Sequence, residues 1–169
     1  RLTDMGIRLM EARVIPDVEE VIVAAINEAR AKYDYVFTTG GIGPTHDDIT
    51  AACVAKAFGV GIERHPEAVK LLQTYIPADR LNEARLKMAD VPIGGELIQN
   101  PVSKAPGFRM ENVFVMAGVP SIMRVMFDGL APYLQGGTRV LSQAVASYLP
   151  EGTVAEGLGQ IQERYPDAD

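Results

Sequence analysis

Thr38-Thr39-Gly40-Gly41-Ile42-Gly43-Pro44-Thr45-His46-Asp47-Asp48-Ile49-Thr50 is the most informative stretch of this chain. It follows a short apolar run at 35–37, which is typical of a buried parallel strand. It leads into residues 50–58, whose apolar spacing predicts a helix ended by Gly59. A glycine-rich turn between a strand and a helix presents free backbone N–H groups, which bind phosphate well. The stretch therefore predicts an α/β fold with a ligand site at this turn.

Two adjacent carboxylates, Asp47 and Asp48, are unusual in such a turn because they repel a bare phosphate. They are explained if a divalent cation lies between carboxylate and phosphate. The alternative is that Asp48 only caps the following helix. His46 either binds metal, acts as an acid or base, or is an exposed residue with no role.

The turn is not a Walker A loop, since no Lys-Ser or Lys-Thr follows the last glycine. Nor is it a Gly-x-Gly-x-x-Gly fingerprint, because Pro44 follows Gly43. It resembles the signature Thr-Thr-Gly-Gly-Thr-Gly-Pro-x-x-x-Asp-Val-Thr of the molybdopterin-binding domain family (MoaB/MogA-like, MoCF_biosynth). The variant in this chain looks most like the CinA (competence/damage-inducible) branch. The resemblance runs over residues 1–134.

Three further pieces resemble family motifs: Ile15-Pro16-Asp17, the loop 100–108 and the turn 117–121. The loop is shortened before Ala105, and Ala117 replaces a family proline. The resemblance implies catalytic roles for Asp17 and Asp48, and metal binding by Asp47 and Asp48, with His46 a further candidate. It implies ligand contacts by a larger set of residues: Thr39, Gly40, Gly41, Ile42, Gly43, Thr45, Lys104, Ala105, Pro106, Gly107, Gly118, Pro120 and Ser121. For Lys104, an exposed lysine without a partner is equally compatible with the sequence.

The family resemblance implies a three-layer αβα fold with a doubly wound, mostly parallel sheet. Ligands of such sheets bind at the carboxyl ends of the strands. Residues 135–169 are expected to begin a small α+β (KH-like) appendage, and a first strand before residue 1 is expected to be missing. Longer CinA proteins also carry a C-terminal deamidase domain. No Gly-x-x-Gly loop suited to RNA is visible in the appendage.

CinA-like proteins are associated with ADP-ribose pyrophosphatase activity, so the resemblance implies a metal-dependent enzyme using Mg, Mn or Co. No Ser–His or Cys–His pair suggests a side-chain nucleophile. The alternative function is binding or adenylylation of molybdopterin, and a second alternative is a non-catalytic pterin or nucleotide module. An acid at Asp47, where adenylyltransferases carry basic residues, and Ile42 in place of threonine favour the pyrophosphatase.

Composition limits the partners. The formal charge is −6 with no basic stripe, which argues against nucleic acid. No apolar run has membrane-spanning length, so we expect a soluble, cytoplasmic protein that does not bind membranes. Its partners are expected to be a small nucleotide or pterin and further copies of itself, since family members form dimers or trimers. The single cysteine, Cys53, is expected to be a small buried residue.

The remaining pattern predicts secondary structure along the chain. We expect strands at 7–15, 97–98, 113–116 and 138–148, an extended link at 60–64, and a short helix ending at Gly6. Asp17 and Glu20 form a capping-box pattern for a helix at 18–32. Further helices are expected from His65, over 77–90, from Ser121 and over 153–165. The basic face of 77–90 (Arg80, Arg85 and Lys87) is expected to be solvated, although Arg85 or Lys87 could reach a phosphate.

Overall fold

The computed structural model of this chain describes residues 1–138, 141 and 143–166. The chain divides into two compact units, one formed by Leu9–Gly136 and the other by Arg1–Arg8 with Gly137–Asp169. The predicted division of the sequence after residue 134 into a family domain and an appendage stays a prediction. The two units are described separately below.

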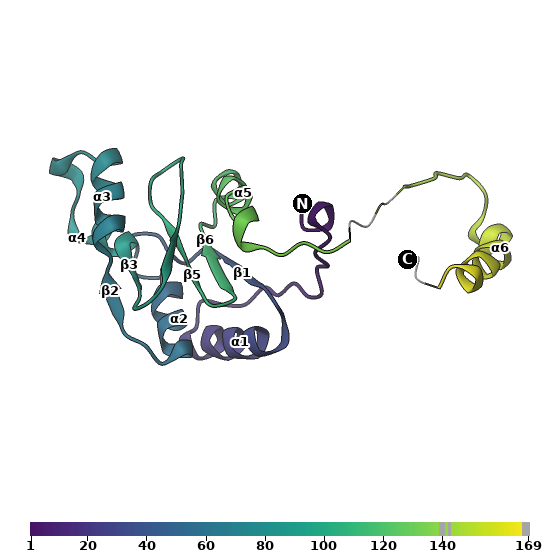
Figure 1. Ribbon diagram of the computed structural model, residues 1–169, viewed down its shortest axis with the longest axis horizontal. Helices are drawn as coiled ribbons and strands as arrows, with labels where there is room; N and C mark the ends of the chain where they lie inside the picture. Colours follow the sequence, from purple (N-terminus) through teal and green to yellow (C-terminus); the bar gives the residue numbers. More distant parts are fainter. Residues whose placement is uncertain (139–140, 142, 167–169) are drawn as a thin grey trace. The chain divides into compact units, whose positions relative to one another are not determined.

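The larger unit is built on a four-stranded sheet with the order β1-β6-β5-β4 (Figure 1). Its strands are β1 (Val36–Thr39), β4 (Glu96–Ile98), β5 (Gly107–Met110) and β6 (Val113–Met116). β1 pairs in parallel with β6, whereas β5 pairs antiparallel with both β6 and β4. Three strands therefore run in one direction and β5 runs against them. The carboxyl ends of β1, β4 and β6 lie at one edge of the sheet.

Helices cover both faces of this sheet, as expected for an αβα arrangement (Figure 1). These are α1 (Glu19–Lys32) and α2 (Thr50–Phe58) on one face and α5 (Pro120–Asp128) on the other. Side chains alternate along β6: Val113 and Val115 join the apolar cluster formed with α1 and α2. Phe114 instead packs with Phe37, whose ring also contacts Phe127 of α5. Cys53 is fully buried in the first cluster, as predicted.

An excursion between α2 and β4 adds β2 (Ile62–Arg64), α3 (Pro66–Tyr75), α4 (Glu83–Leu86) and β3 (Asp90–Pro92), with β2 and β3 antiparallel. His65 caps α3, because its Nδ1 accepts a hydrogen bond from the Glu67 amide at 3.2 Å. The prediction of one helix over 77–90 is wrong. This segment is split into α4 and the 3-10 turns Ala78–Arg80 and Lys87–Ala89. The Asn82 side chain accepts the Arg85 amide and so starts a new helix inside the segment.

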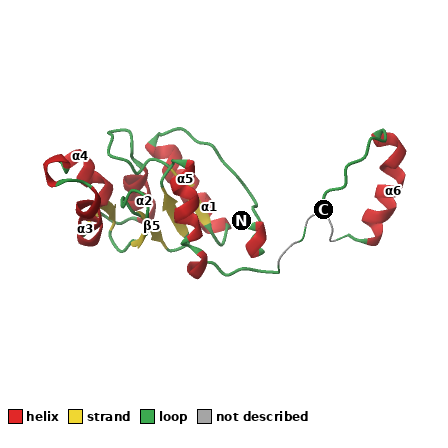
Figure 2. Ribbon diagram, turned by 90° about the horizontal axis from the view of Figure 1, so that it is seen from above, coloured by secondary structure: helices red, strands yellow, loops and turns green. Residues whose placement is uncertain are grey.

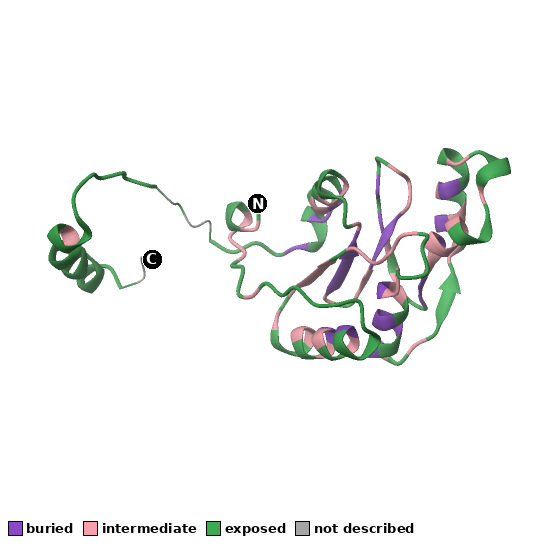
Figure 3. Ribbon diagram, turned by 180° about the vertical axis from the view of Figure 1, so that it is seen from behind, coloured by how far each residue is buried: buried purple, intermediate pink, exposed green. Residues whose placement is uncertain are grey.

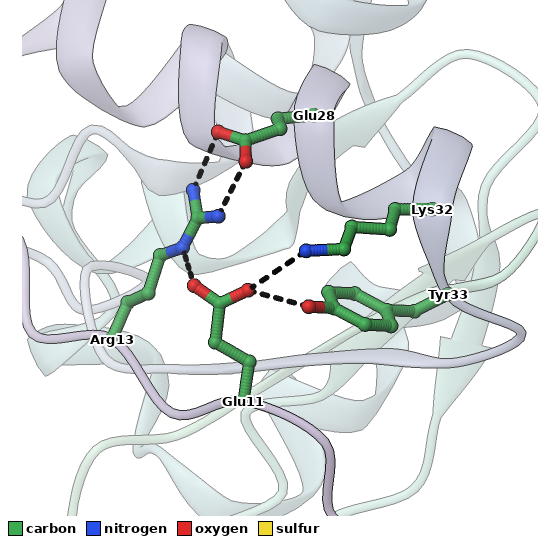
Figure 4. A network of polar contacts seen from close by, with 5 residues as sticks. All are labelled: Glu11, Arg13, Glu28, Lys32 and Tyr33. Carbon is green, nitrogen blue, oxygen red and sulfur yellow. Dashed lines mark hydrogen bonds and ion pairs between the residues drawn. The ribbon is translucent and has the colours of Figure 1, made fainter.

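Residues 7–15 form no strand, so that prediction is wrong; the segment before α1 is loop (Figure 2). Hydrogen bonds between side chains, rather than backbone pairing with a neighbouring strand, hold this segment in position. Arg13 donates to both carboxylate oxygens of Glu28 at 2.8 and 2.6 Å and also pairs with Glu11 (Figure 4). Tyr33 donates to Glu11 at 2.6 Å. The alternating apolar pattern alone did not indicate whether a neighbouring strand would pair with this segment.

The predicted capping box at α1 is also wrong. The N-cap of α1 is Val18, and no side chain caps the helix. The Val18 amide donates to the Pro16 carbonyl at 2.8 Å, which makes a tight turn. This turn leaves Asp17 outside the helix start.

The smaller unit contains a 3-10 turn at Thr3–Met5, which ends at Gly6 with φ of 70°, and α6 (Glu151–Arg164). The predicted helices ending at Gly6 and near 153–165 are confirmed in location. Of the strand expected at 138–148, residues 139, 140 and 142 lie outside the described residues, and the others form no strand. The residues of α6 are almost all exposed, as the colour of its ribbon shows (Figure 3). Within the described part of the chain, no helix is long and apolar enough to cross a membrane.

Candidate functional site

The turn after β1 is shaped by its glycines. Gly40 and Gly41 have φ angles of 95° and 68°, in the left-handed region that costs other residues about 1–2 kcal/mol. The Gly40 amide donates to the Met116 carbonyl at 3.0 Å, and the Thr50 amide donates to the Gly41 carbonyl at 2.9 Å. A Cβ on Gly41 would lie 2.0 Å from Thr50 Oγ1. These contacts fix the path from the end of β1 to the start of α2.

Asp48 closes the second half of the turn. Its Oδ2 accepts hydrogen bonds from the Thr45 amide at 2.9 Å and from the Thr45 hydroxyl. Gly43 permits this approach, since a Cβ there would lie 2.7 Å from the same oxygen. The N-cap of α2 is Ile49, and no side chain caps the helix, so the alternative that Asp48 caps α2 is wrong. Asp48 instead bends the loop back on itself.

Asp47 and Asp48 both favour the charged form. Burial raises the pKa of Asp48, but hydrogen bonds from Thr45 and Gly43 and the charge of Lys87 outweigh it, so the pKa lies below the ordinary value. The Thr45 hydroxyl and its own backbone amide lower the pKa of Asp47. Two neighbouring carboxylates therefore stay ionised at neutral pH. This charge disfavours a bare anion and favours a cation.

The first half of the turn offers hydrogen-bond donors. Within the described part of the chain, no residue accepts a hydrogen bond from the amides of Gly41 and Ile42. The Ile42 side chain packs against the core cluster beneath α2 and presents no polar group. Unpaired backbone amides in a glycine-rich turn are good donors to phosphate oxygens.

The turn after β6 lies against the glycine turn. A Cβ on Gly118 would lie 3.0 Å from the Gly40 Cα and 3.4 Å from the Gly40 nitrogen. Pro120 is the first residue of α5, and Ser121 follows it with its side chain exposed. The backbone contact therefore brings the two predicted motifs together.

The loop between β4 and β5 is organised by Asn100, which is 2% exposed. Its side-chain amide donates to Ser103 Oγ at 2.7 Å and to the Ala105 carbonyl at 2.8 Å. Its carbonyl oxygen accepts the amides of Val102 and Ser103. Lys104 takes a left-handed φ of 59°, and its ammonium has no partner among the residues that the structure describes. The loop thus holds a lysine on a fixed backbone.

Not every predicted ligand residue is free for a ligand. Gly107 is buried at the start of β5, where a Cβ would lie 2.1 Å from the Val115 carbonyl oxygen. Its role in this structure is therefore close strand packing. Pro106 is buried beside it, and Ala105 packs against the apolar cluster of α3.

The predicted residues on three turns follow the carboxyl ends of β1, β4 and β6, at one edge of the sheet. Asp17 is exposed before α1 and makes no capping bond. Glu19, two residues after Asp17, pairs with Lys56 of α2. No group of three or more His, Cys, Asp or Glu is placed to hold a metal within the described residues. Asp17 does not complete a three-ligand set with Asp47 and Asp48 in this structure.

The sequence named Lys87 only as an alternative phosphate contact on a basic face that was expected to be solvated. Its ammonium donates to the Thr45 carbonyl at 2.5 Å, although the two residues are 42 positions apart. The expectation of a wholly solvated basic face is therefore wrong for Lys87. The Arg85 guanidinium donates a hydrogen bond to the Arg80 carbonyl at 2.8 Å.

A surface depression of about 400 Å³ lies away from these turns, over α1 near Ile15 and Val21. No predicted ligand residue lines it.

The fold and these turns define an α/β domain with a candidate ligand site, and comparisons with known proteins identify its family. Residues 1–136 match the family described as "Probable molybdopterin binding domain" (MoCF_biosynth). The structure of the CinA protein of unknown function from Thermoplasma acidophilum superposes with a TM-score of 0.72 and 30% identity. That match covers 78% of this chain and 81% of the other.

Sequence relatives carry corresponding names. A "CinA-like protein" of Desulfosudis oleivorans is 36% identical over 95% of this chain, and a "Putative competence-damage inducible protein" of Alkaliphilus metalliredigens is 34% identical over 80%. This chain covers only 42% and 34% of their lengths, but 68% of a 37% identical protein of Pyrobaculum calidifontis. The chain belongs to the molybdopterin-binding domain family, in its CinA-like branch. The predicted family and α/β fold class are confirmed.

Proposed function

We propose that this chain is the nucleotide-binding part of a metal-dependent pyrophosphatase that acts on ADP-ribose or a related dinucleotide. One observation carries the proposal: ionised Asp47 and Asp48 stand in the same turn as the unpaired amides of Gly41 and Ile42. The amides suit phosphate oxygens, whereas the carboxylates repel them. Asp47 and Asp48 would hold a divalent cation, whose positive charge would allow the carboxylates and a phosphate to share one turn.

The donor set fits a magnesium-type ion. Mg²⁺ is commonly held by one or two carboxylates together with substrate phosphates and water, so a protein cluster of three ligands is not required. Asp47 is exposed, and Asp48 keeps Oδ1 free of the Thr45 bonds that occupy Oδ2. Such an ion supplies charge neutralisation and a lower pKa for bound water.

The residues of the chain itself bind and orient the substrate. The turn amides bind and orient the diphosphate, and Lys104 is a second candidate contact from the neighbouring loop. In the hydrolysis, water attacks one phosphorus of ADP-ribose and the bridging P–O bond breaks. The products are AMP and ribose 5-phosphate, and two protons are released as both new phosphate monoesters ionise.

A second candidate function is binding or adenylylation of molybdopterin, favoured by the description of the matched family. Ile42 and Asp47 argue for the pyrophosphatase. The first packs on the core and offers no hydroxyl, and the second places negative charge where a pterin phosphate would bind. We also propose assembly into dimers or trimers and a cytoplasmic location, which size-exclusion chromatography with light scattering and cell fractionation can test.

The test uses the full-length protein. It is incubated with ADP-ribose, with FAD, and with ATP plus molybdopterin, each with and without Mg²⁺, Mn²⁺ or Co²⁺, and the products are identified by mass. We expect metal-dependent release of AMP from ADP-ribose or FAD. Adenylylated pterin as the product would instead establish the second candidate. Ligand binding without any turnover would favour a non-catalytic module.

Matched variants test the metal ligands. Asp48→Asn retains an acceptor for Thr45 and so preserves the turn, but it removes the charge. We expect it to abolish metal-dependent turnover while the circular dichroism spectrum stays unchanged. Asp79→Asn, at an exposed position in the excursion, is the control and should behave like the wild type. Asp17→Ala is expected to abolish turnover as well, and full activity in either site variant would overturn the assignment.

A further inference from the structure

The excursion between α2 and β4 reaches the glycine turn through Lys87. Its backbone position is fixed, because the 3-10 turn Lys87–Ala89 packs on α3. Ala89 is fully buried in a cluster with Ala68 and Leu72, and Met88 packs against the same cluster. The Ala89 carbonyl also accepts the His65 amide at 2.9 Å. Lys87 is therefore presented from a rigid support.

The contact of Lys87 with the turn uses only part of its capacity. One N–H of the ammonium donates to the Thr45 carbonyl at 2.5 Å. An ammonium has three donors, and Lys87 makes no other hydrogen bond or ion pair within the described part of the chain. Its charge also acts on Asp48. A half-buried cation with spare donors thus stands beside the turn that carries Asp47 and Asp48.

Its neighbours in the excursion are not equivalent. Arg85 is engaged by the Arg80 carbonyl, and Arg64 is held by Glu83 and Asp90. Lys70 is exposed on α3 and makes no hydrogen bond or ion pair with the residues that the structure describes. Lys87 is the basic residue that the excursion contributes to the candidate site.

We propose that Lys87 is a phosphate-binding residue of this site and that it contacts the diphosphate while it braces Thr45. This inference rests on the proposed function, because it assigns a cation to the same diphosphate ligand. The charge balance supports it: two carboxylates and a diphosphate concentrate negative charge at one turn, and residues 38–50 include no lysine or arginine. A lysine on a flexible stem can turn its free donors toward an oxyanion without moving its backbone.

A purely structural role would have a different signature. If Lys87 only braced the turn, its loss would lower stability, and ligand binding would fall with it regardless of charge at the position. If Lys87 binds phosphate, ligand affinity must depend on a cation at this position more than on how well the turn is braced. Thermal unfolding separates the two cases, because arginine keeps both the charge and an N–H donor for the Thr45 carbonyl. A loss of affinity in Lys87→Met that exceeds the loss of stability indicates phosphate binding, and rescue by arginine shows that a cationic donor is what the position needs.

The experiment measures binding of inorganic pyrophosphate and of ADP-ribose, each with Mg²⁺, to the full-length protein by calorimetry. Lys87→Met, Lys87→Arg and the control Lys70→Met are compared with the wild type, and thermal unfolding is recorded for each. We expect Lys87→Met to weaken both affinities about 10- to 100-fold, the range of a charge-assisted hydrogen bond. Lys87→Arg is expected to stay within about threefold of wild type, and Lys70→Met to match it.

The outcomes separate this inference from the proposed function. Wild-type affinity in Lys87→Met, or equal weakening in Lys87→Met and Lys87→Arg, overturns the role of Lys87 even if ADP-ribose is hydrolysed. Loss of pyrophosphate binding in Lys87→Met, with arginine rescue but no hydrolysis by the wild type, supports Lys87 and overturns the pyrophosphatase. A wild-type protein that binds neither probe overturns both.

Discussion

Gly118 lies so close to Gly40 that a Cβ on Gly118 would be 3.0 Å from the Gly40 Cα. The Gly40 amide meanwhile donates to the carbonyl of Met116, two residues before Gly118. The turns after β1 and β6 are therefore one packed backbone unit. The positions of the donor amides in the glycine turn depend on a residue that belongs to another motif.

Gly118→Ala tests this dependence. The new methyl group would push the Gly40 backbone by a few tenths of an ångström, because backbone atoms have no rotamer with which to yield. We expect pyrophosphate binding to weaken about 3- to 10-fold, since small misplacements of binding groups are costly. The free energy of unfolding should fall by only about 1 kcal/mol. Calorimetry measures the affinity for pyrophosphate, and urea unfolding measures the free energy of unfolding.

The control is Gly157→Ala in α6, where a Cβ meets no atom within 4 Å. It should bind pyrophosphate as the wild type does. Unchanged binding by Gly118→Ala would show that the glycine turn keeps its position without the turn after β6.

The local parts of the fold could be predicted from the sequence. The apolar run before Gly40 and the spacing up to Gly59 determine β1 and α2, because each pattern lies within one element. β5 (Gly107–Met110) was not predicted. It is four residues long, and it is defined by its pairing with β4 and β6. The alternating segment 7–15 shows the converse, since the pattern is present and no strand forms.

The same distinction between local patterns and long-range contacts applies to the candidate site. The glycines and carboxylates could be found because they are consecutive in one motif. The contact of Lys87 with Thr45 could not, because it depends on how the excursion folds back over 42 positions. Nor did the motif indicate that Gly43 is needed to admit the Asp48 carboxylate, or Gly107 to let β5 approach β6.

Gly107→Ala tests whether that glycine is structural. A methyl group would lie 2.1 Å from the Val115 carbonyl oxygen and 2.7 Å from Met126 Cε. The carbonyl belongs to the central strand and cannot move aside. We expect a loss of about 3 kcal/mol in the free energy of unfolding, measured in urea. Gly152→Ala, in open space, serves as the control, and a loss below about 1 kcal/mol for Gly107→Ala would contradict the structural role.

Asn100→Asp tests the loop that carries Lys104. Aspartate keeps the two acceptor contacts but loses the donors to Ser103 Oγ and the Ala105 carbonyl, and it places a charge at a position that is 2% exposed. We expect about 3 kcal/mol of destabilisation at pH 7 by urea unfolding. Asn82→Asp is the matched control, because the exposed Asn82 caps α4 and aspartate caps equally well. Equal stability of the two variants would show that the Asn100 donors contribute nothing.

Glu11 gives the protein a predictable acid sensitivity. The hydrogen bond from Arg13, followed by that from Tyr33, lowers the pKa of Glu11 from 4.5 to about 2 (Figure 4). Between these two pH values the unfolded chain binds more protons at this position than the folded chain does. The stabilisation from Glu11 is therefore complete above pH 4.5 and is lost as the pH falls toward about 2.

Glu11→Gln removes this titration. We expect the free energy of unfolding, measured in urea from pH 6 to pH 2, to fall less steeply in the variant than in the wild type below pH 4.5. Some acid sensitivity remains, because Arg13 also lowers the pKa of Glu28. Glu63→Gln, at an exposed position in β2, is the control and should leave the slope unchanged. Parallel curves for Glu11→Gln and the wild type would mean that Arg13 and Tyr33 do not hold the segment before α1 in solution.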